Sequence, residues 1–331
     1  MVPGETMRFI VNKPNLSREQ AEGLLLKPRD RISLDIETVS LENTLPLGIA
    51  VGLDDTTGFY FFNPRDEILM ELVARTPTIL IHNASFDLSI LRRLGYTIQN
   101  YEDTMLLAYS AGILEKSLEA LSHSILGRDC PSVTSQWRKK DQGNIAIDHV
   151  KMGGISIIHA CNTYALWDKI PKTQLYTDID RPCIDLVVEM EYWGVLIDQV
   201  GLTEVEQATV VRVNKLEQEL IQELGKLNLA SNPQVVKALQ AKGILGTRKT
   251  RAGKDSVSEE SLKPLNHPIA DKVLKWRSLM KTLTTYIPAF RKPDAIGRIH
   301  TQFGYTNTGR WSSSKPNLQN ITRDDKFDGN E

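Results

Sequence analysis

The stretch RISLDIETVS, residues 31–40, places Asp35 and Glu37 two positions apart within an apolar, β-prone run. Side chains at positions i and i+2 of a β-strand point to the same face, so a strand here brings the two carboxylates side by side. Two like charges on one face repel each other unless a cation lies between them. The pair therefore predicts a cation site, to which other acidic groups of the chain could contribute.

The bulk composition is that of an ordinary globular protein. The chain has 331 residues, of which 41% are hydrophobic and 24% charged, and this length predicts about two domains. A net charge of −1 means that any nucleic-acid surface has to be local. Three widely spaced cysteines favour reduced thiols over a disulfide or zinc framework. No apolar run is long enough to span a bilayer and no secretory signal opens the chain, so we expect a cytoplasmic protein.

The first half alternates β-prone runs with helical periodicity. Strands are predicted over residues 31–37, 47–55, 58–63 and 77–83, and helices over residues 85–96, 103–113, 117–127 and 156–170. Residues 127–154 are polar and flanked by glycines, which predicts an irregular excursion. Strands and helices mixed within one unit predict an α/β domain.

The second half is predicted to be mainly helical. Leucines and valines recur at three-and-four spacing over residues 203–228, and two more helices are predicted over residues 231–243 and 267–287. Between Arg248 and Thr301 the chain has twelve Lys and Arg against five Asp and Glu, a local net charge of +7. Arg277 and Lys281, four residues apart on one helix, are therefore expected to face nucleic-acid phosphates, although a solvated basic face explains the same charges.

Two further segments carry candidate ligands for the cation. HNASFD places Asp87 one helical turn after Asn83, and YALWD places Tyr164 and Asp168 on one face of a helix. Each alone has a structural explanation, as a helix cap or a surface pair. Together with Asp35 and its neighbour they form an all-oxygen set, which favours Mg²⁺ or Mn²⁺. Two such ions can activate a water and hydrolyse a phosphodiester, with Tyr164 orienting that water.

The segments LDIET, HNASFD and YALWD resemble the three motifs of the DEDDy-type 3′–5′ exonucleases. The resemblance implies a ribonuclease H-like domain whose carboxylates bind two divalent metal ions, namely Asp35, Glu37, Asp87 and Asp168. It also implies that Tyr164 lies beside the nucleophile, Leu41 against the terminal base and Asn83 near the scissile end of the substrate. The third motif departs from the common YAxxDA form, because Lys169 follows its aspartate.

The second half resembles the polymerase part of family A DNA polymerases. EMEYWGVLID, LASNPQVVKALQAKGI and KVLKWRSLMKTLTTYI are similar to its thumb segments, and GRIHTQFGYTNTGRWSSSKPNLQNI is similar to GRxHxxxxxxxTGRLSSxxPNLQNIP. The resemblance implies an exonuclease domain over residues 1–172, a helical DNA-binding thumb over 173–295 and the beginning of a palm over 296–331. It also places Arg310 at the minor groove near the primer terminus, with Gln319 and Asn320 close to it.

The function implied is a proofreading 3′–5′ exonuclease of DNA replication, in a bacterium or a phage-infected cell. It would take a single-stranded DNA 3′ end in the exonuclease site and duplex DNA at the thumb. Because the family's palm aspartates and fingers helix lie beyond the matched segment, no polymerase activity is expected from this chain alone. Two alternatives remain open: a DNA-binding subunit of a split polymerase, completed by a separate chain carrying palm and fingers, and a stand-alone DEDDy exonuclease acting on RNA.

Overall fold

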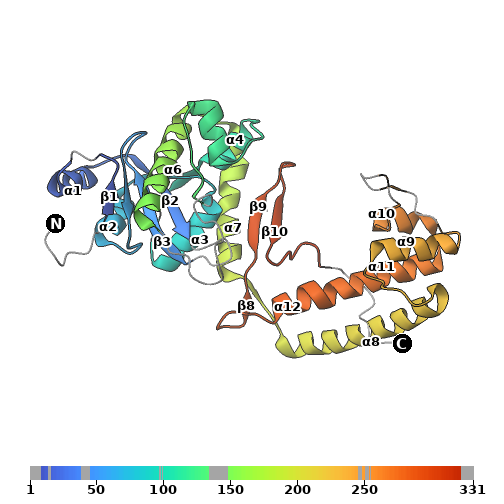
Figure 1. Ribbon diagram of the computed structural model, residues 1–331. Helices are drawn as coiled ribbons and strands as arrows, with labels where there is room; N and C mark the ends of the chain where they lie inside the picture. The colour runs from blue at the N-terminus through green and yellow to red at the C-terminus, as the bar shows by residue number, and fades with distance from the viewer. Residues whose placement is uncertain are drawn as a thin grey trace. The chain divides into compact units, whose positions relative to one another are not determined.

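The chain packs into two compact units, which are described separately. The computed structural model (Figure 1) describes residues 9–13, 16–38, 45–96, 98, 100–133, 148–244, 248–249, 253 and 255–321. The sheet unit is the chain up to Tyr192 together with residues 305–310, and the helical unit is the remainder. The predicted three-way division of the chain stays a prediction. Within the described residues, none of the helices combines the length and the apolar character needed to cross a membrane.

The sheet unit is built on one mixed sheet. Its strands are β1 (Phe9–Val11), β2 (Arg31–Thr38), β3 (Pro46–Gly52), β4 (Gly58–Phe61), β5 (Thr78–Ile81) and β6 (Tyr101–Asp103). Their order is β1-β4-β3-β2-β5-β6, with β2 antiparallel to β3 and parallel to β5. The four predicted strands are present, and the prediction of a mixed α/β domain is confirmed.

Helices accompany this sheet, and four of the helical segments lie where periodicity predicted them. They are α1 (Arg18–Leu26), α2 (Glu67–Arg75), α3 (Ala84–Leu94), α4 (Thr104–Ser110), α5 (Leu118–Leu121), the π-helical turns η1 (Ser122–Leu126) and η3 (Tyr176–Asp180), α6 (His149–Lys169) and α7 (Arg181–Trp193). Of these, α1, α2 and α7 were not predicted. The helix α6 begins seven residues before the predicted start, because Asp148 caps it by accepting a hydrogen bond from the Lys151 amide. Part of the predicted excursion is therefore helical, and residues 134–147 lie outside the described residues.

The strand β2 separates an apolar face from a polar one. Ile32, Leu34 and Ile36 are buried, whereas the alternate positions of the strand, which carry the polar side chains, lie along α6. Figure 1 shows α6 lying over the strands of the sheet. A close approach fixes the helix there: the Ser33 hydroxyl donates to the Ala160 carbonyl at 2.6 Å, and a Cβ on Gly52 would lie 3.0 Å from the Ala160 backbone. This contact sets which residues of α6 face which residues of β2.

One buried carboxylate, Asp103 at the end of β6, holds the beginnings of two helices. It accepts hydrogen bonds from the amides of Asn83 and Ala84, at 3.2 and 2.8 Å, where α3 begins. It also accepts from the amides of Met105 and Leu106, at 2.8 and 3.1 Å, in the first turn of α4. The side chain thus satisfies backbone donors that each helix leaves without an intrahelical partner. It thereby fixes the start of α3, the helix that carries Asp87.

The remaining elements are mostly helical. They are β7 (Val195–Leu196), α8 (Gln199–Leu224), α9 (Asn232–Ala241), α10 (Glu259–Leu262), the 3₁₀ turn η4 (Lys263–Leu265), α11 (Pro268–Lys281), the π-helical η5 (Thr282–Tyr286), α12 (Ile287–Phe290), β8 (Arg298–Ile299), β9 (Gln302–Tyr305) and β10 (Trp311–Ser314). The apolar stripe predicted on α8 is present: Val213 and Leu220 are buried against α11, although Val210 is 40% exposed. The mainly helical second half is confirmed.

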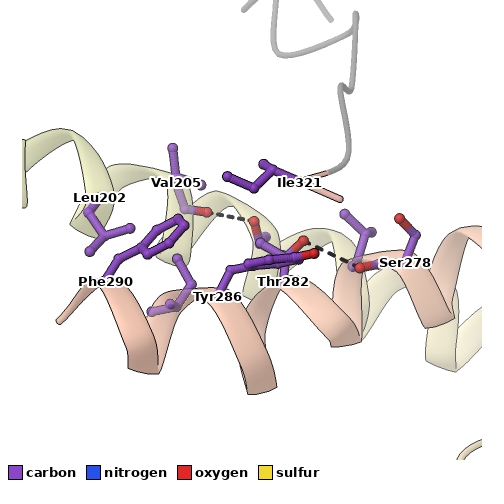
Figure 2. Close-up of a pocket in the computed structure, with 10 residues that line it drawn as sticks. Leu202, Val205, Ser278, Thr282, Tyr286, Phe290 and Ile321 are labelled. Carbon is purple, nitrogen blue, oxygen red and sulfur yellow. Dashed lines mark hydrogen bonds between the residues drawn. The ribbon is translucent and has the colours of Figure 1, made fainter. Parts of the chain in front are cut away.

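The helical unit has an apolar pocket beside α8. Figure 2 shows its lining: Leu202 and Val205 come from α8, Tyr286 and Phe290 from the run η5–α12, and Ile321 from the segment after β10. The cavity volume is about 150 Å³. The pocket contains no charged side chain among its lining residues, so it is a gap in apolar packing and no candidate for phosphate chemistry.

Candidate metal centre

Within the described residues, three side chains in the sheet unit lie close enough to hold one metal ion. Asp35 and Glu37 project from β2 and His159 projects from α6, and their ligand atoms all lie within 4.8 Å of one another. They line a pocket of about 290 Å³, to which Pro131 and His82 also contribute. The predicted pairing of the two β2 carboxylates is therefore present, and a histidine accompanies it.

The imidazole of His159 is held in a defined orientation. Its Nε2 lies 2.7 Å from the Pro131 carbonyl oxygen, and because a carbonyl can only accept, Nε2 carries the proton. Its Nδ1 lies 3.6 Å from Asp35 Oδ2, a buried oxygen that has no hydrogen-bond partner among the described residues. A ring nitrogen and a carboxylate oxygen thus face each other across the pocket.

The electrostatics of the group follow from burial and crowding. Burial and the neighbouring charge of Asp35 raise the pKa of Glu37 to about 7, against the hydrogen bond that Ser156 Oγ donates to Glu37 Oε1 at 2.7 Å. Burial alone would lower the pKa of His159, but its interactions with Asp35 and Cys130 raise that pKa to about 11. A bound cation would offset the repulsion between the neighbouring carboxylates Asp35 and Glu37.

Asp87 is the third acidic group of this region. It lies in the first turn of α3, it is 5% exposed, and burial together with the charge of Asp35 raises its pKa well above the usual range. Because β5 pairs in parallel with β2, the helix that follows β5 begins beside the end of β2 that carries Glu37. Asp87 therefore belongs to the electrostatic field of the centre, although it is outside the group whose ligand atoms lie within 4.8 Å.

The structure does not bring Tyr164 and Asp168 to this centre. Asp168 Oδ2 lies 2.5 Å from the guanidinium of Arg31, and that guanidinium lies 4.7 Å from the centre of the Tyr164 ring. Arg31 precedes Asp35 by four residues, a rise of about 13 Å along a strand. In this structure the α6 side chain that faces Asp35 is a histidine, and the predicted convergence of four carboxylates stays a prediction.

The register of α6 explains the difference. Ser156 contacts Glu37, His159 contacts Asp35, and Ala160 contacts Ser33, so the helix and β2 run in opposite directions. Tyr164 and Asp168 occupy later turns and lie beyond the carboxylates. Sequence reasoning missed His159, because an isolated histidine matches no acidic motif and any two residues four apart on a helix share a face.

Two other predicted residues of the exonuclease site have different outcomes. Asn83 has a left-handed backbone conformation, with φ of 69°, directly before α3, and its amide is bonded to Asp103. Its predicted contact with the substrate stays a prediction. Leu41, the predicted wedge against the terminal base, lies outside the described residues.

The two predicted thumb contacts differ in their surroundings. Arg277 is half-buried: its guanidinium donates to the Val257 carbonyl and to Asn232 Oδ1, each at 2.7 Å. Its guanidinium therefore contributes to the packing of the helical unit, and its predicted contact with a duplex stays a prediction. Lys281 is exposed, with its Nζ 5.7 Å from the Tyr286 ring centre.

The predicted palm contacts lie in the hairpin segment. Arg310 is exposed, and its amide is bonded to the Thr306 hydroxyl. Gln319 holds β10 in place, because its amide group donates to the Trp311 carbonyl and accepts from the Ser313 amide. The carbonyl of Asn320 accepts a hydrogen bond from the Tyr286 hydroxyl at 2.6 Å. Their contacts with DNA stay predictions.

Comparison with protein-family models finds two matches. Residues 10–153 match the 3′–5′ exonuclease family, and residues 199–329 match DNA polymerase family A. The two matches cover the sheet unit through the first turns of α6 and the helical unit from the start of α8.

Curated relatives and solved structures give the same result. The chain is 29% identical over 261 residues to a DNA polymerase I of Rhizobium leguminosarum, covering 72% of this chain and 26% of that protein. It is 31% identical over 251 residues to the thermostable DNA polymerase I of Thermus aquaticus, covering 71% of this chain and 28% of that protein. The fold is similar to that of the POL domain of Pol1 from M. smegmatis, which was solved in complex with DNA primer-template and dNTP. The TM-score is 0.68 and the sequence identity 22%, and the match covers 91% of this chain and 53% of the other. The chain thus spans about a quarter of the length of these two curated relatives.

Proposed function

Because the chain belongs to DNA polymerase family A and carries a 3′–5′ exonuclease domain and part of the polymerase domain, we propose that its sheet unit hydrolyses the terminal phosphodiester at a DNA 3′ end. The observation that supports this most directly is the pair Asp35 and Glu37 on β2, which lies within the residues matched to the 3′–5′ exonuclease family. The pair lines an open pocket together with His159, which follows the matched range. The role in replication is proofreading.

The residues fit a divalent metal ion. A dication held by Asp35, Glu37 and His159, with Asp87 close by, would supply Lewis-acid chemistry by lowering the pKa of a bound water and neutralising the phosphodiester. The chain's own groups orient this centre. Ser156 fixes one oxygen of Glu37, the Pro131 carbonyl fixes the imidazole ring, and Asp103 fixes the start of the helix that carries Asp87.

The helical unit is proposed to bind duplex DNA. The net charge of +7 between Arg248 and Thr301 suits phosphate contacts, which are independent of sequence and weaken with salt. Lys281 of this unit is exposed and remains available for such contacts. The primer-template in the M. smegmatis polymerase structure supports this proposal by likeness of fold.

The test is hydrolysis of 3′-labelled single-stranded DNA by the purified full chain in the presence of divalent ions. We expect metal-dependent release of nucleoside monophosphates, lost in Asp35→Asn and kept in the control Asp178→Asn, which changes an exposed aspartate of η3 outside the pocket. An RNA strand of the same sequence distinguishes a DNA exonuclease from an RNA-trimming one. Absence of metal-dependent release with any ion, from a chain that is folded by circular dichroism, would refute the proposal.

A further inference from the structure

We propose that residues 305–310, which lie within the polymerase-family match, work as part of the exonuclease: through Lys116 they position one wall of the candidate metal pocket. Lys116 is thus a positioning residue for the terminal nucleotide of the substrate. The inference rests on the proposed function for what the pocket does. It goes further because it gives a role in hydrolysis to a segment outside the exonuclease match.

The segment 305–310 is a closed turn of the sheet unit. The Thr306 amide donates to the Arg310 carbonyl at 2.8 Å, and the Gly309 amide donates to the Thr306 carbonyl at 3.2 Å. Gly309 has a φ of 76°, a left-handed conformation in which a side chain would be strained. The turn is therefore one compact element, and its place in the sheet unit depends on the groups that hold it there.

A buried carboxylate anchors the beginning of the turn. Asp180 of η3 is 4% exposed, and each of its oxygens accepts from one hydroxyl: Tyr305 donates at 2.9 Å and Ser110 of α4 at 2.5 Å. A buried carboxylate oxygen that loses its donor is costly. The carboxylate therefore fixes Tyr305 on η3 and α4.

Tyr109 of α4 holds the rest of the turn. Its ring meets the Tyr305 ring edge-on, with 4.7 Å between the ring centres and an interplanar angle of 78°. Its hydroxyl donates to the Asn307 carbonyl at 3.1 Å. A Cβ on Gly309 would lie 3.3 Å from the same hydroxyl oxygen. The turn thus lies directly against Tyr109 along most of its length.

Lys116 joins the turn to the pocket. Its Nζ donates to the Tyr305 carbonyl at 2.6 Å. Its own carbonyl accepts from His82 Nε2 at 2.9 Å, and since a carbonyl can only accept, that nitrogen carries the proton. His82 lines the candidate metal pocket, as do Leu118 and Glu119 at the start of α5. One residue therefore contacts the turn with its side chain and the pocket wall with its backbone.

The position of Lys116 determines which kinetic constant depends on it. Leu118 follows it by two residues, so the two Cα atoms are no more than about 7 Å apart. The carboxylates Asp35 and Glu37 come from β2 and face α6. A shift of Lys116 therefore moves the wall against which a terminal nucleotide would lie and leaves the carboxylates in place. Loss of binding that is equal in the ground state and the transition state raises KM without changing kcat.

The test uses Tyr305→Phe in the full chain, because this change removes one hydroxyl outside the pocket and no charge. We expect KM for hydrolysis of single-stranded DNA to rise roughly threefold to tenfold, the effect of one net hydrogen bond, with kcat changed less than about twofold. Amide hydrogen exchange should accelerate over residues 116–121. The matched control Tyr96→Phe removes a hydroxyl that donates to the Pro64 carbonyl at 2.7 Å, and it should leave KM and that exchange unchanged.

Variants of Lys116 test the same connection from its other end. Lys116→Met should raise KM by a similar factor, and Lys116→Arg, which keeps a donor for the Tyr305 carbonyl, should restore most of the loss. Because both changes break one connection, the double variant Tyr305→Phe with Lys116→Met should be little worse than the weaker single variant. Effects on KM that multiply in the double variant would overturn the inference.

Hydrogen exchange separates this inference from the proposed function. Unchanged KM in Tyr305→Phe, or unchanged exchange over residues 116–121, would overturn the inference while the exonuclease remains. Faster exchange there, without DNA hydrolysis by the natural chain under any ion, would support the positioning of the wall and refute the exonuclease.

Discussion

Replacing Asp103 by alanine should destabilise the sheet unit more than the loss of any single helix cap. Its carboxylate accepts four backbone hydrogen bonds, two at the start of α3 and two in the first turn of α4, and it is 2% exposed. One lost N-cap costs about 1 kcal/mol, and buried amides left without partners add to this cost. We therefore expect Asp103→Ala to lower the free energy of unfolding by roughly 2–4 kcal/mol.

The matched control is Asp66, which caps only one helix. It is also buried, and it accepts from the amides of Ile68 and Leu69 at the start of α2. Asp66→Ala should cost about half as much, roughly 1–2 kcal/mol. Asp103→Asn should cost no more than Asp66→Ala, because the oxygen that bonds three of the four amides is retained and only the bond to Ala84 is lost.

The assay is thermal unfolding of the full chain, combined with hydrogen exchange of the peptides that contain Ala84 and Met105. For a unit of this size, 2–4 kcal/mol corresponds to a fall in Tm of roughly 5–15 °C. Exchange should accelerate at the starts of both α3 and α4. Equal losses for Asp103→Ala and Asp66→Ala, or faster exchange at only one helix, would refute the double-capping argument.

Three further predictions concern packing, charge and pH. Arg277→Met should lower the free energy of unfolding of the helical unit by about 1–3 kcal/mol in urea, because two internal hydrogen bonds are lost. Lys281→Met should leave that stability unchanged and weaken duplex DNA binding in a salt titration. Loss of stability in Lys281→Met but not in Arg277→Met would contradict the structure. Gly52→Ala should cost about 1–3 kcal/mol by the same measurement, because the new Cβ meets the Ala160 backbone and the Ser33 hydroxyl; an unchanged stability would show that α6 can move aside. Burial and the Asp35 charge raise the pKa of Glu37 to about 7, and burial raises the pKa of Asp87. The folded chain therefore binds more protons than the unfolded chain, and the free energy of unfolding should fall as pH rises from about 4.5 to above 7. Urea unfolding in chelator at several pH values measures this fall, and Glu37→Gln should flatten it; a rise over the same window, or no change in the variant, would contradict it.

The strands of the sheet unit could be predicted because the polar and apolar pattern that determines each of them lies within its own segment of the sequence. The alternation of polar and apolar residues in β2 places Asp35 and Glu37 on one face, whichever helix covers that face. Likewise, the apolar stripe of α8 marks its buried side independently of the partner helix. Positions that depend only on strand or helix period were therefore predicted correctly.

The register of α6 could not be predicted in the same way. Several turns of one helix carry a residue pair at four-residue spacing, and the turn that faces Asp35 is selected by long-range packing. The contact of Ala160 with Ser33 and the absence of a side chain at Gly52 make that selection. The same limit applies to Arg277, since a stripe of basic residues does not show which guanidinium finds internal acceptors. In both cases the missing information is which distant backbone lies opposite.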